Sequence, residues 1–394
     1  MTAVAPPISP LDAARAVLPI VAARAGAVDE NAEFPVESLT ALRETPLMGL
    51  LVPRDYGGMG GTLADLAEVA RELATACTAT AVIWSMHCQQ VAAVVRHAGP
   101  GLRERVLPRI ARGQIYVGSV TTERGKGGHL LTAQAPLEPA PGGRLRLHRD
   151  APISTGALHA DAYLITMRAA PEAADTDVRL VWADRPAVSV RTHSGWNPMG
   201  MRGTQSVALA IDGEIEAGDV VGRDFRDVAL RTFVPAGHIA WASAWLGAAQ
   251  GAYRRTVSML RDPRSRRGYD LNSELLVTRL ARSRADLDCI EALLERTIAT
   301  VDRIGGHGTT AEVESPAYQI LVNELKVIAS ERSFEAVNRL VDLVGLRHGY
   351  LKASTTGLER VLRDLRSAPL MYANDRLDLA NGRLALFDRA ARLP

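Results

Sequence analysis

The stretch Leu358-Glu-Arg-Val-Leu-Arg-Asp-Leu-Arg-Ser-Ala-Pro-Leu-Met-Tyr-Ala-Asn-Asp375 says most about the fold and the chemistry of this chain. It contains an arginine–aspartate pair, Arg363-Asp364, followed by a turn with Tyr372 and Ala373. Neither Tyr372 nor Ala373 can act as a carboxylate base, and Asp375 lies on the same turn. The regions that precede this stretch indicate the scaffold on which it sits.

Working outward, the period of the apolar residues divides the 394 residues into three regions. Residues 1–113 follow a helical period, and residues 114–223 contain short β-rich runs separated by Pro-Gly and Asp-Gly turns. Residues 224–394 return to helices, with one apolar face from Leu276 to Val301 and a helix start at Ser315-Pro316. We therefore expect a mainly α protein with a helical N-terminal domain, a middle β domain and a C-terminal helical bundle.

Composition narrows the class of protein. Hydrophobic residues make up 47% and charged residues 23%, and the net charge of +2 is too small to indicate a nucleic-acid partner. No apolar run is long enough to span a bilayer, and no signal peptide is recognisable. The three cysteines, Cys77, Cys88 and Cys289, contain no CxxC pair, which predicts a protein of the reducing cytoplasm. The histidines His129, His148 and His159 lack metal-ligand spacing, so we expect no metal.

Four stretches, taken in order, resemble the acyl-CoA dehydrogenase superfamily, which includes dibenzothiophene-monooxygenase-like and nitrososynthase branches. They are Thr122-Glu-Arg-Gly-Lys-Gly-Gly-His129, Ile153-Ser-Thr-Gly156, Gly200-Met-Arg-Gly-Thr-Gln-Ser206 and the segment from Leu358. The resemblance covers nearly the whole chain. It implies a helical N-terminal domain, a middle β-barrel domain and a C-terminal four-helix bundle that assembles as a homotetramer or homodimer.

The resemblance also implies that the chain binds FAD. A flavin ring requires flat apolar walls, hydrogen-bond donors at its polar edge and cations or amides for its phosphates. An arginine at Arg264 would reach the FAD of a neighbouring subunit, although the family's phenylalanine is here Arg267. The other positions that match cofactor contacts are Thr122, the backbone of Gly128, Ser154 or Thr155 depending on one gap, and Asn374.

The activity that the resemblance implies is α,β-dehydrogenation of an acyl thioester on CoA or a carrier protein, with electrons passed to an external acceptor. Removal of the α proton requires a carboxylate, but both of the family's positions for it lack one, because they match Tyr372 and Gly237. The preferred substitute base is Asp375, with His238 and Glu123 as alternatives. Tyr372 would narrow the pocket, donate a hydrogen bond or simply pack.

Two other functions remain open. A flavin monooxygenase of this fold needs no such base and takes reduced flavin from a separate reductase, with His87 and Ser154 near the flavin edge. On a long apolar helix, however, His87 is more often a hydrogen-bonded core histidine than a catalytic group. The chain could also be a non-catalytic subunit of a hetero-oligomer.

Overall fold

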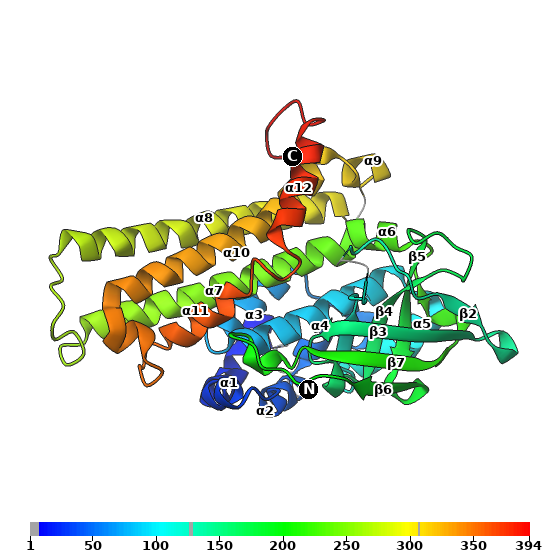
Figure 1. The fold of residues 1–394 in the computed structure, drawn as a ribbon, viewed down its shortest axis with the longest axis horizontal. Helices are drawn as coiled ribbons and strands as arrows, with labels where there is room; N and C mark the ends of the chain where they lie inside the picture. Colours follow the sequence, from blue (N-terminus) through cyan, green and yellow to red (C-terminus); the bar gives the residue numbers. More distant parts are fainter. Residues whose placement is uncertain (1–7, 126–128, 306–307) are drawn as a thin grey trace, which may run out of the picture.

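The structure is a computed structural model that describes residues 8–125, 129–305 and 308–394. Helices at the N-terminal end are followed by a central β region and then by long helices, in the order expected from the sequence (Figure 1). The long helices run side by side away from the sheets, which lie at the opposite end of the molecule (Figure 1). Within the described ranges, no helix combines the length and the apolar character needed to cross a membrane.

Two of the N-terminal helices begin at residues whose side chains cap them. Ser9 accepts a hydrogen bond from the backbone N–H of Asp12, and Thr62 and Asp65 form a reciprocal capping box. These contacts satisfy backbone N–H groups that have no partner inside the helix. The helices are α1 (Pro10–Asn31), α2 (Val36–Arg43), α3 (Leu63–Ala74), α4 (Thr78–His97) and α5 (Pro100–Ala111).

The central strands form two four-stranded sheets with the orders β1-β4-β5-β8 and β2-β3-β7-β6. Among the named strands, only β1 and β4 pair in parallel, and no strand of one sheet pairs with a strand of the other. The register of β3 against β7 shifts between Ala151 and Ser154, which breaks the alternation of side chains between the two faces of the sheet. The strands are β1 (Val117–Val120), β2 (Leu137–Pro139), β3 (Leu145–Ser154), β4 (Ala162–Arg168), β5 (Val178–Asp184), β6 (Val188–Thr192), β7 (Val207–Ile215) and β8 (Val220–Val221).

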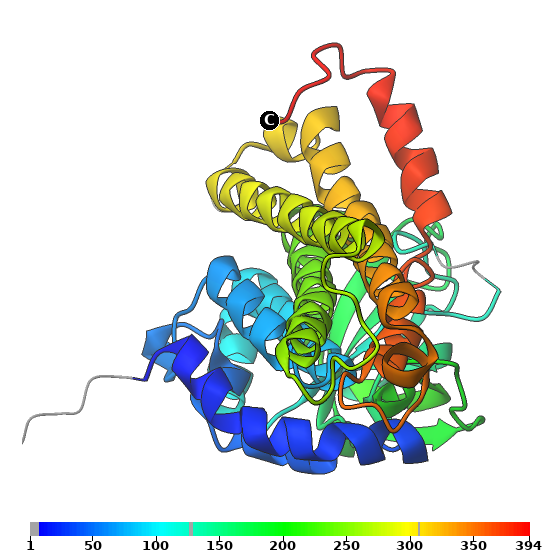
Figure 2. The ribbon, with the colours of Figure 1, turned by 90° about the vertical axis from the view of Figure 1, so that its left-hand side faces the viewer.

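Three long helices build the C-terminal part, and the short α11 packs against two of them, α7 and α10. The predicted apolar face from Leu276 to Val301 is buried along one side of α8. Ser315 caps α10 as predicted, with Pro316 in the first turn. Helix α12, drawn in red in Figure 2, packs against α10, where the amide of Asn323 donates to Oδ1 of Asn381 at 2.9 Å. The helices are α6 (Phe225–Val228), α7 (Val234–Arg261), α8 (Glu274–Gly305), α9 (Thr310–Val313), α10 (Pro316–Gly345), α11 (Leu358–Arg366) and α12 (Asn374–Ala385).

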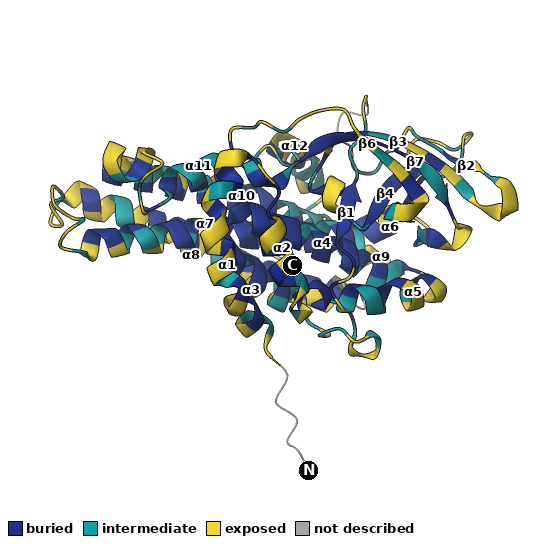
Figure 3. Ribbon diagram, turned by 90° about the horizontal axis from the view of Figure 1, so that it is seen from below, coloured by how far each residue is buried: buried dark blue, intermediate teal, exposed yellow. Residues whose placement is uncertain are grey.

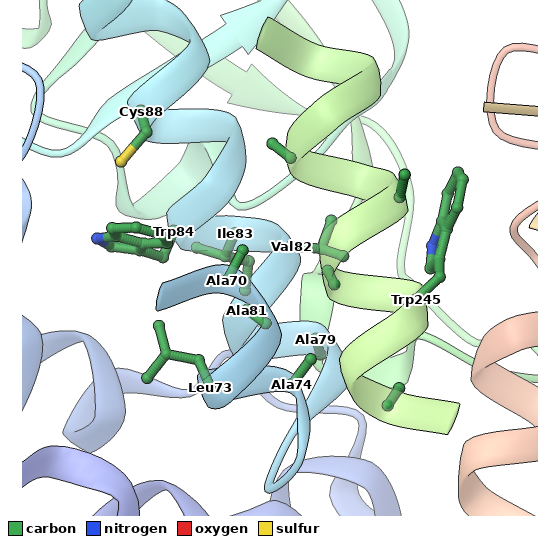
Figure 4. Close-up of a cluster of buried hydrophobic side chains, with 14 of the residues drawn as sticks. Ala70, Leu73, Ala74, Ala79, Ala81, Val82, Ile83, Trp84, Cys88 and Trp245 are labelled. Atoms are coloured by element: carbon green, nitrogen blue, oxygen red, sulfur yellow. The ribbon is translucent and has the colours of Figure 1, made fainter. Parts of the chain in front are cut away.

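The helical core joins the N-terminal helices to the C-terminal helices, because α3 and α4 pack against α7. Small side chains allow close contact: a Cβ added at Gly247 would lie 2.1 Å from the carbonyl oxygen of Arg71. Trp84 and Trp245 are both fully buried, and Trp245 projects from α7 on the side away from α4 (Figure 4). Buried residues accordingly continue through the helices into the sheets (Figure 3). The sheets are thereby held at one end of a rigid helical body.

Candidate active site

A cleft of about 650 Å³ lies where the β domain meets α4 and the segment from α11 to α12. Its volume falls within the roughly 300–1,000 Å³ of pockets that bind small molecules and cofactors. Met199 and Leu370 are 67% and 66% exposed, which places them at its mouth. Further apolar lining comes from Val82, Leu130, Ile153, Trp196 and Met371.

A chain of hydroxyl groups lines one side of the cleft. The Oγ atom of Ser206 lies 2.9 Å from the Oγ1 atoms of both Thr155 and Thr204. Of the two residues predicted to contact the flavin ring, Thr155 lines the cleft, whereas Ser154 is buried outside the lining. Thr122 also lines the cleft, and its hydroxyl donates to the carbonyl of Ile153 at 2.6 Å. The cleft therefore offers hydroxyls from three segments of the β domain.

Below Thr122, a buried ion pair fixes the backbone of this loop. Arg149 is fully buried, and its Nη1 lies 2.9 Å from Oε2 of Glu123, whose side chain is 7% exposed. Arg149 Nε donates to the carbonyl of Thr122 at 3.1 Å. Glu123 also accepts the backbone N–H groups of Gln134 and Ala135, so it is engaged away from the cleft. Gly128, the predicted phosphate contact, lies outside the described residues.

The arginine–aspartate pair fastens α11 to the rest of the molecule. Arg363 donates to both carboxylate oxygens of Asp29 on α1, at 3.0 and 2.6 Å, and Asp364 accepts the backbone N–H of Met201 at 2.5 Å. Burial raises the pKa of Asp364 to about 6. A Cβ at Gly200 would lie 2.0 Å from the carbonyl oxygen of Arg363, so the glycine permits backbone contact here. This pair therefore builds one wall of the cleft.

The two positions where the family's glutamate was expected differ in their surroundings. Tyr372 lines the cleft, and burial raises the pKa of its phenol, which keeps it protonated as a donor. At Gly237 an added Cβ would lie 2.3 Å from Nε2 of Gln89, so a side chain has no room there. His238 is buried and donates through Nδ1 to the carbonyl of Val322 at 2.9 Å; burial lowers its pKa to about 4.

Four other predicted residues lie outside the lining of the cleft. Asp375 is exposed on the first turn of α12, and Arg264 is exposed in the loop between α7 and α8. Asn374 is buried in contact with α10 rather than with the cleft. His87 donates to the carbonyl of Met48 at 2.8 Å and accepts the N–H of Val117 at 3.1 Å, so both ring nitrogens are engaged in the core.

The charges at the cleft are all positive. Arg363, Arg366 and Arg376 line it, whereas no aspartate or glutamate does so among the residues that the structure describes. The sequence did not identify Trp196, Arg366 or Arg376 as lining residues. For Arg366 a signal was available, because it lies in the stretch 358–375 that resembles the family. Apolar walls, hydroxyls and cations together suit a flat ring system that carries an anionic group.

Comparisons with known proteins agree with this architecture. The family model described as "Acyl-CoA dehydrogenase, N-terminal domain" matches residues 12–114, and "Acyl-CoA dehydrogenase, C-terminal domain" matches residues 227–372. Cyclohex-1-ene-1-carbonyl-CoA dehydrogenase of Syntrophus aciditrophicus is 24% identical, over 93% of this chain and 86% of its own. Dibenzothiophene monooxygenase of Mycolicibacterium goodii is 23% identical, over 87% of this chain and 85% of its own.

Solved structures extend the likeness to the three-dimensional fold. The FMN-bound structure of TdsC from Paenibacillus sp. A11-2 superposes with a TM-score of 0.85 at 20% sequence identity, with 98% of each chain covered. At this identity the likeness establishes the fold and not the reaction. The matched domains, the order of helices and sheets and this superposition lead to one conclusion: the chain belongs to the acyl-CoA dehydrogenase family.

Proposed function

We propose that this protein is a flavin-dependent monooxygenase that receives reduced flavin from a separate reductase and uses molecular oxygen. One observation carries the choice: among the described residues, no carboxylate lines the cleft. A base that removes the α proton of a thioester must come within about 2.6–3.2 Å of that proton's carbon, or reach it through one water. Two carboxylates were considered for this role. Asp375 is exposed on α12, and Glu123 forms an ion pair with the buried Arg149.

The residues of the cleft suit this chemistry. Reduced flavin supplies the electrons and reacts with oxygen, and the protein has to hold the ring, orient the substrate and exclude water. The apolar walls around Trp196 and Met371 would exclude water, and the hydroxyls of Thr122 and Thr155, which line the cleft, would be the donors and acceptors for the polar edge of the ring. The phenol of Tyr372 provides a hydrogen-bond donor, not a base.

Relatives of both kinds exist, so they do not decide the reaction. A CoA dehydrogenase and a dibenzothiophene monooxygenase match the chain at almost equal identity. FAD remains our prediction for the cofactor from the sequence signatures, with FMN as the alternative. Titration of flavin-free protein with each, followed by quenching of flavin fluorescence, measures which one binds more tightly.

The decisive experiment uses flavin-loaded protein under two conditions. In the first, a flavin reductase, NADH and ¹⁸O₂ are supplied with a panel of aromatic sulfides, indoles and amines, and products are analysed by mass spectrometry. We expect incorporation of ¹⁸O, or oxidation of the substrate that requires both oxygen and the reductase. In the second, acyl-CoA thioesters of increasing length are mixed anaerobically with the oxidised holoprotein, and we expect no bleaching of the flavin.

Bleaching by a thioester at a rate that supports turnover would overturn the proposal and favour the dehydrogenase. A chain that binds no flavin at micromolar concentration would instead indicate the non-catalytic subunit. As a control for adventitious oxidation, the reductase system is run with free flavin and catalase but without the protein.

A further inference from the structure

Tyr372 stands between the cleft and the central helix of the bundle. Its side chain lines the cleft on one side, and on the other its ring centroid lies 6.3 Å from that of His238 on α7. No residue of α7, which is described in full, lines the cleft itself. Beyond Tyr372, His238 and Trp241 have ring centroids 6.1 Å apart, and Trp241 and Trp245 continue the aromatic row. Tyr372 therefore closes the cleft toward this aromatic layer.

The backbone at Tyr372 has a conformation that tyrosine rarely adopts. Its φ of 51° lies in the left-handed region, where Cβ crowds the following carbonyl. A bulky residue keeps such a conformation only when its surroundings impose it, since the strain is of the order of 1–3 kcal/mol. Some contact must therefore hold this turn in place.

That contact comes from Lys326 on α10, whose side chain is fully buried. Its Nζ donates to the carbonyl of Tyr372 at 3.3 Å and to Oδ1 of Asn374 at 2.6 Å. The amide of Asn374 in turn donates to Ser330 Oγ at 3.1 Å and to Glu331 at 2.9 Å. The lysine thus joins the backbone of Tyr372 and the side chain of Asn374, which flank Ala373, to helix α10.

Burial of the Lys326 ammonium costs free energy that packing alone does not explain. Its ammonium lies 5.7 Å from the centroid of the Trp245 ring, and the carboxylates whose charges act on it are those of Glu331 and Asp378. The loss of hydration on burial outweighs the attraction of these two carboxylates and lowers the pKa of Lys326 to about 7. An apolar side chain of similar length would avoid this cost, but it could not bond to the turn.

We propose that Tyr372 is the residue that limits the size of the apolar ligand in this cleft, and that Lys326 is the positioning residue that holds it. Tyr372 occupies the place through which a larger ring system would extend toward His238 and Trp241. The inference rests on the proposed function only in taking the cleft as the ligand site, and it holds for a monooxygenase or a dehydrogenase.

The test measures binding without turnover. Naphthalene and phenanthrene are titrated calorimetrically into the oxidised, flavin-loaded protein, and the ratio of their affinities reports the depth of the cleft. Tyr372→Ala should raise the phenanthrene-to-naphthalene ratio by about tenfold or more, because an additional ring is buried. Tyr372→Phe keeps the ring and should leave the ratio within about twofold of the wild type.

Lys326→Met tests the positioning role, and Lys352→Met at an exposed lysine is the matched control. We expect Lys326→Met to raise the ratio severalfold and Lys352→Met to leave it unchanged. A lysine that only stabilised the fold would lower both affinities alike and leave their ratio unaltered. If Lys326→Met does not fold, Asn374→Ala removes the acceptor of the shorter bond and should raise the ratio in the same way.

Each outcome bears on the proposal. An unchanged ratio in Tyr372→Ala would refute the size limit, and an unchanged ratio in both Lys326→Met and Asn374→Ala would refute the positioning role. Failure of every variant to bind either probe would show that the cleft is not an apolar ligand site. None of these results depends on oxygen or acyl-CoA, so they are separate from the test of the reaction.

Discussion

The substitution Arg149→Met should destabilise the protein strongly, since it leaves a buried carboxylate without its counter-charge. Arg149 and Glu123 have side chains that are 0% and 7% exposed, and removal of one partner from such a pair costs about 3–5 kcal/mol. Glu123 retains two backbone N–H donors, which favours the lower end of that range. The carbonyl of Thr122 also loses its donor, at about 1 kcal/mol. We therefore expect a total loss of about 3–4 kcal/mol.

The assay is urea-induced unfolding of the holoprotein, followed by circular dichroism. Arg24→Met is the matched control, because Arg24 and Glu37 form an ion pair whose side chains are 48% and 51% exposed. Exposed pairs contribute about 0–1 kcal/mol, so the control should remain close to the wild type. The double variant Glu123→Gln/Arg149→Met should lose less than the sum of the two single variants, because no unpaired charge is then buried.

A loss below about 1 kcal/mol in Arg149→Met, equal to that in Arg24→Met, would refute the reasoning. It would mean that water or a rearranged side chain solvates Glu123 in the variant. Glu123 would then be free to reach the cleft, and its exclusion as a catalytic base would have to be withdrawn.

Three further predictions concern pH, packing and the base. The buried histidines His87 and His238 and the half-buried His97 have folded pKa values of about 4, so unfolding takes up protons as the pH falls from 6.5 toward 4. Asp364, whose folded pKa is raised to about 6, partly offsets this effect. The free energy of unfolding should therefore fall steeply over that range, and equal values at pH 7 and pH 5 would contradict this prediction. Gly200→Ala should weaken flavin binding at least tenfold in a fluorescence titration, because its Cβ would displace the carbonyl of Arg363; unchanged affinity would show that α11 can shift freely. Asp375→Asn should leave kcat within about twofold, whereas loss of a general base lowers it by about 10²–10⁴; a loss of that size would restore Asp375 as the base.

The order of helices and sheets could be predicted from the sequence because hydrophobic period depends on local geometry. The apolar face of α8 repeats over many turns, and Ser315-Pro316 carries a capping signal within two residues. The arrangement of the strands in two sheets could not be predicted in this way, because strand pairing joins residues far apart in the chain. β1, for example, pairs with β4 and not with the next strand.

The site was less accessible from the sequence than the fold. Ser154 and Thr155 could not be distinguished, because the shift of register in β3 falls between Ala151 and Ser154 and breaks the alternation of side chains. Asp375 was favoured because it is close in sequence to the turn, but the first turn of α12 leaves it exposed. Arg149 was missed, although its position alternates with the buried residues Leu147 and Ala151, which was a usable signal for an inward-facing charge.

The tie between Arg363 and Asp29 has a consequence for how the protein is made. The two residues stand near opposite ends of the chain, and the cleft closes only when α11 reaches α1. During synthesis the first helices emerge and can pack long before α11 leaves the ribosome. The cleft therefore cannot be complete on the growing chain until almost the whole protein has been translated. A nascent chain stalled before α11 would already contain α7, the partner of α3 and α4, but Asp29 on α1 would lack Arg363 and the cleft would lack its wall from α11.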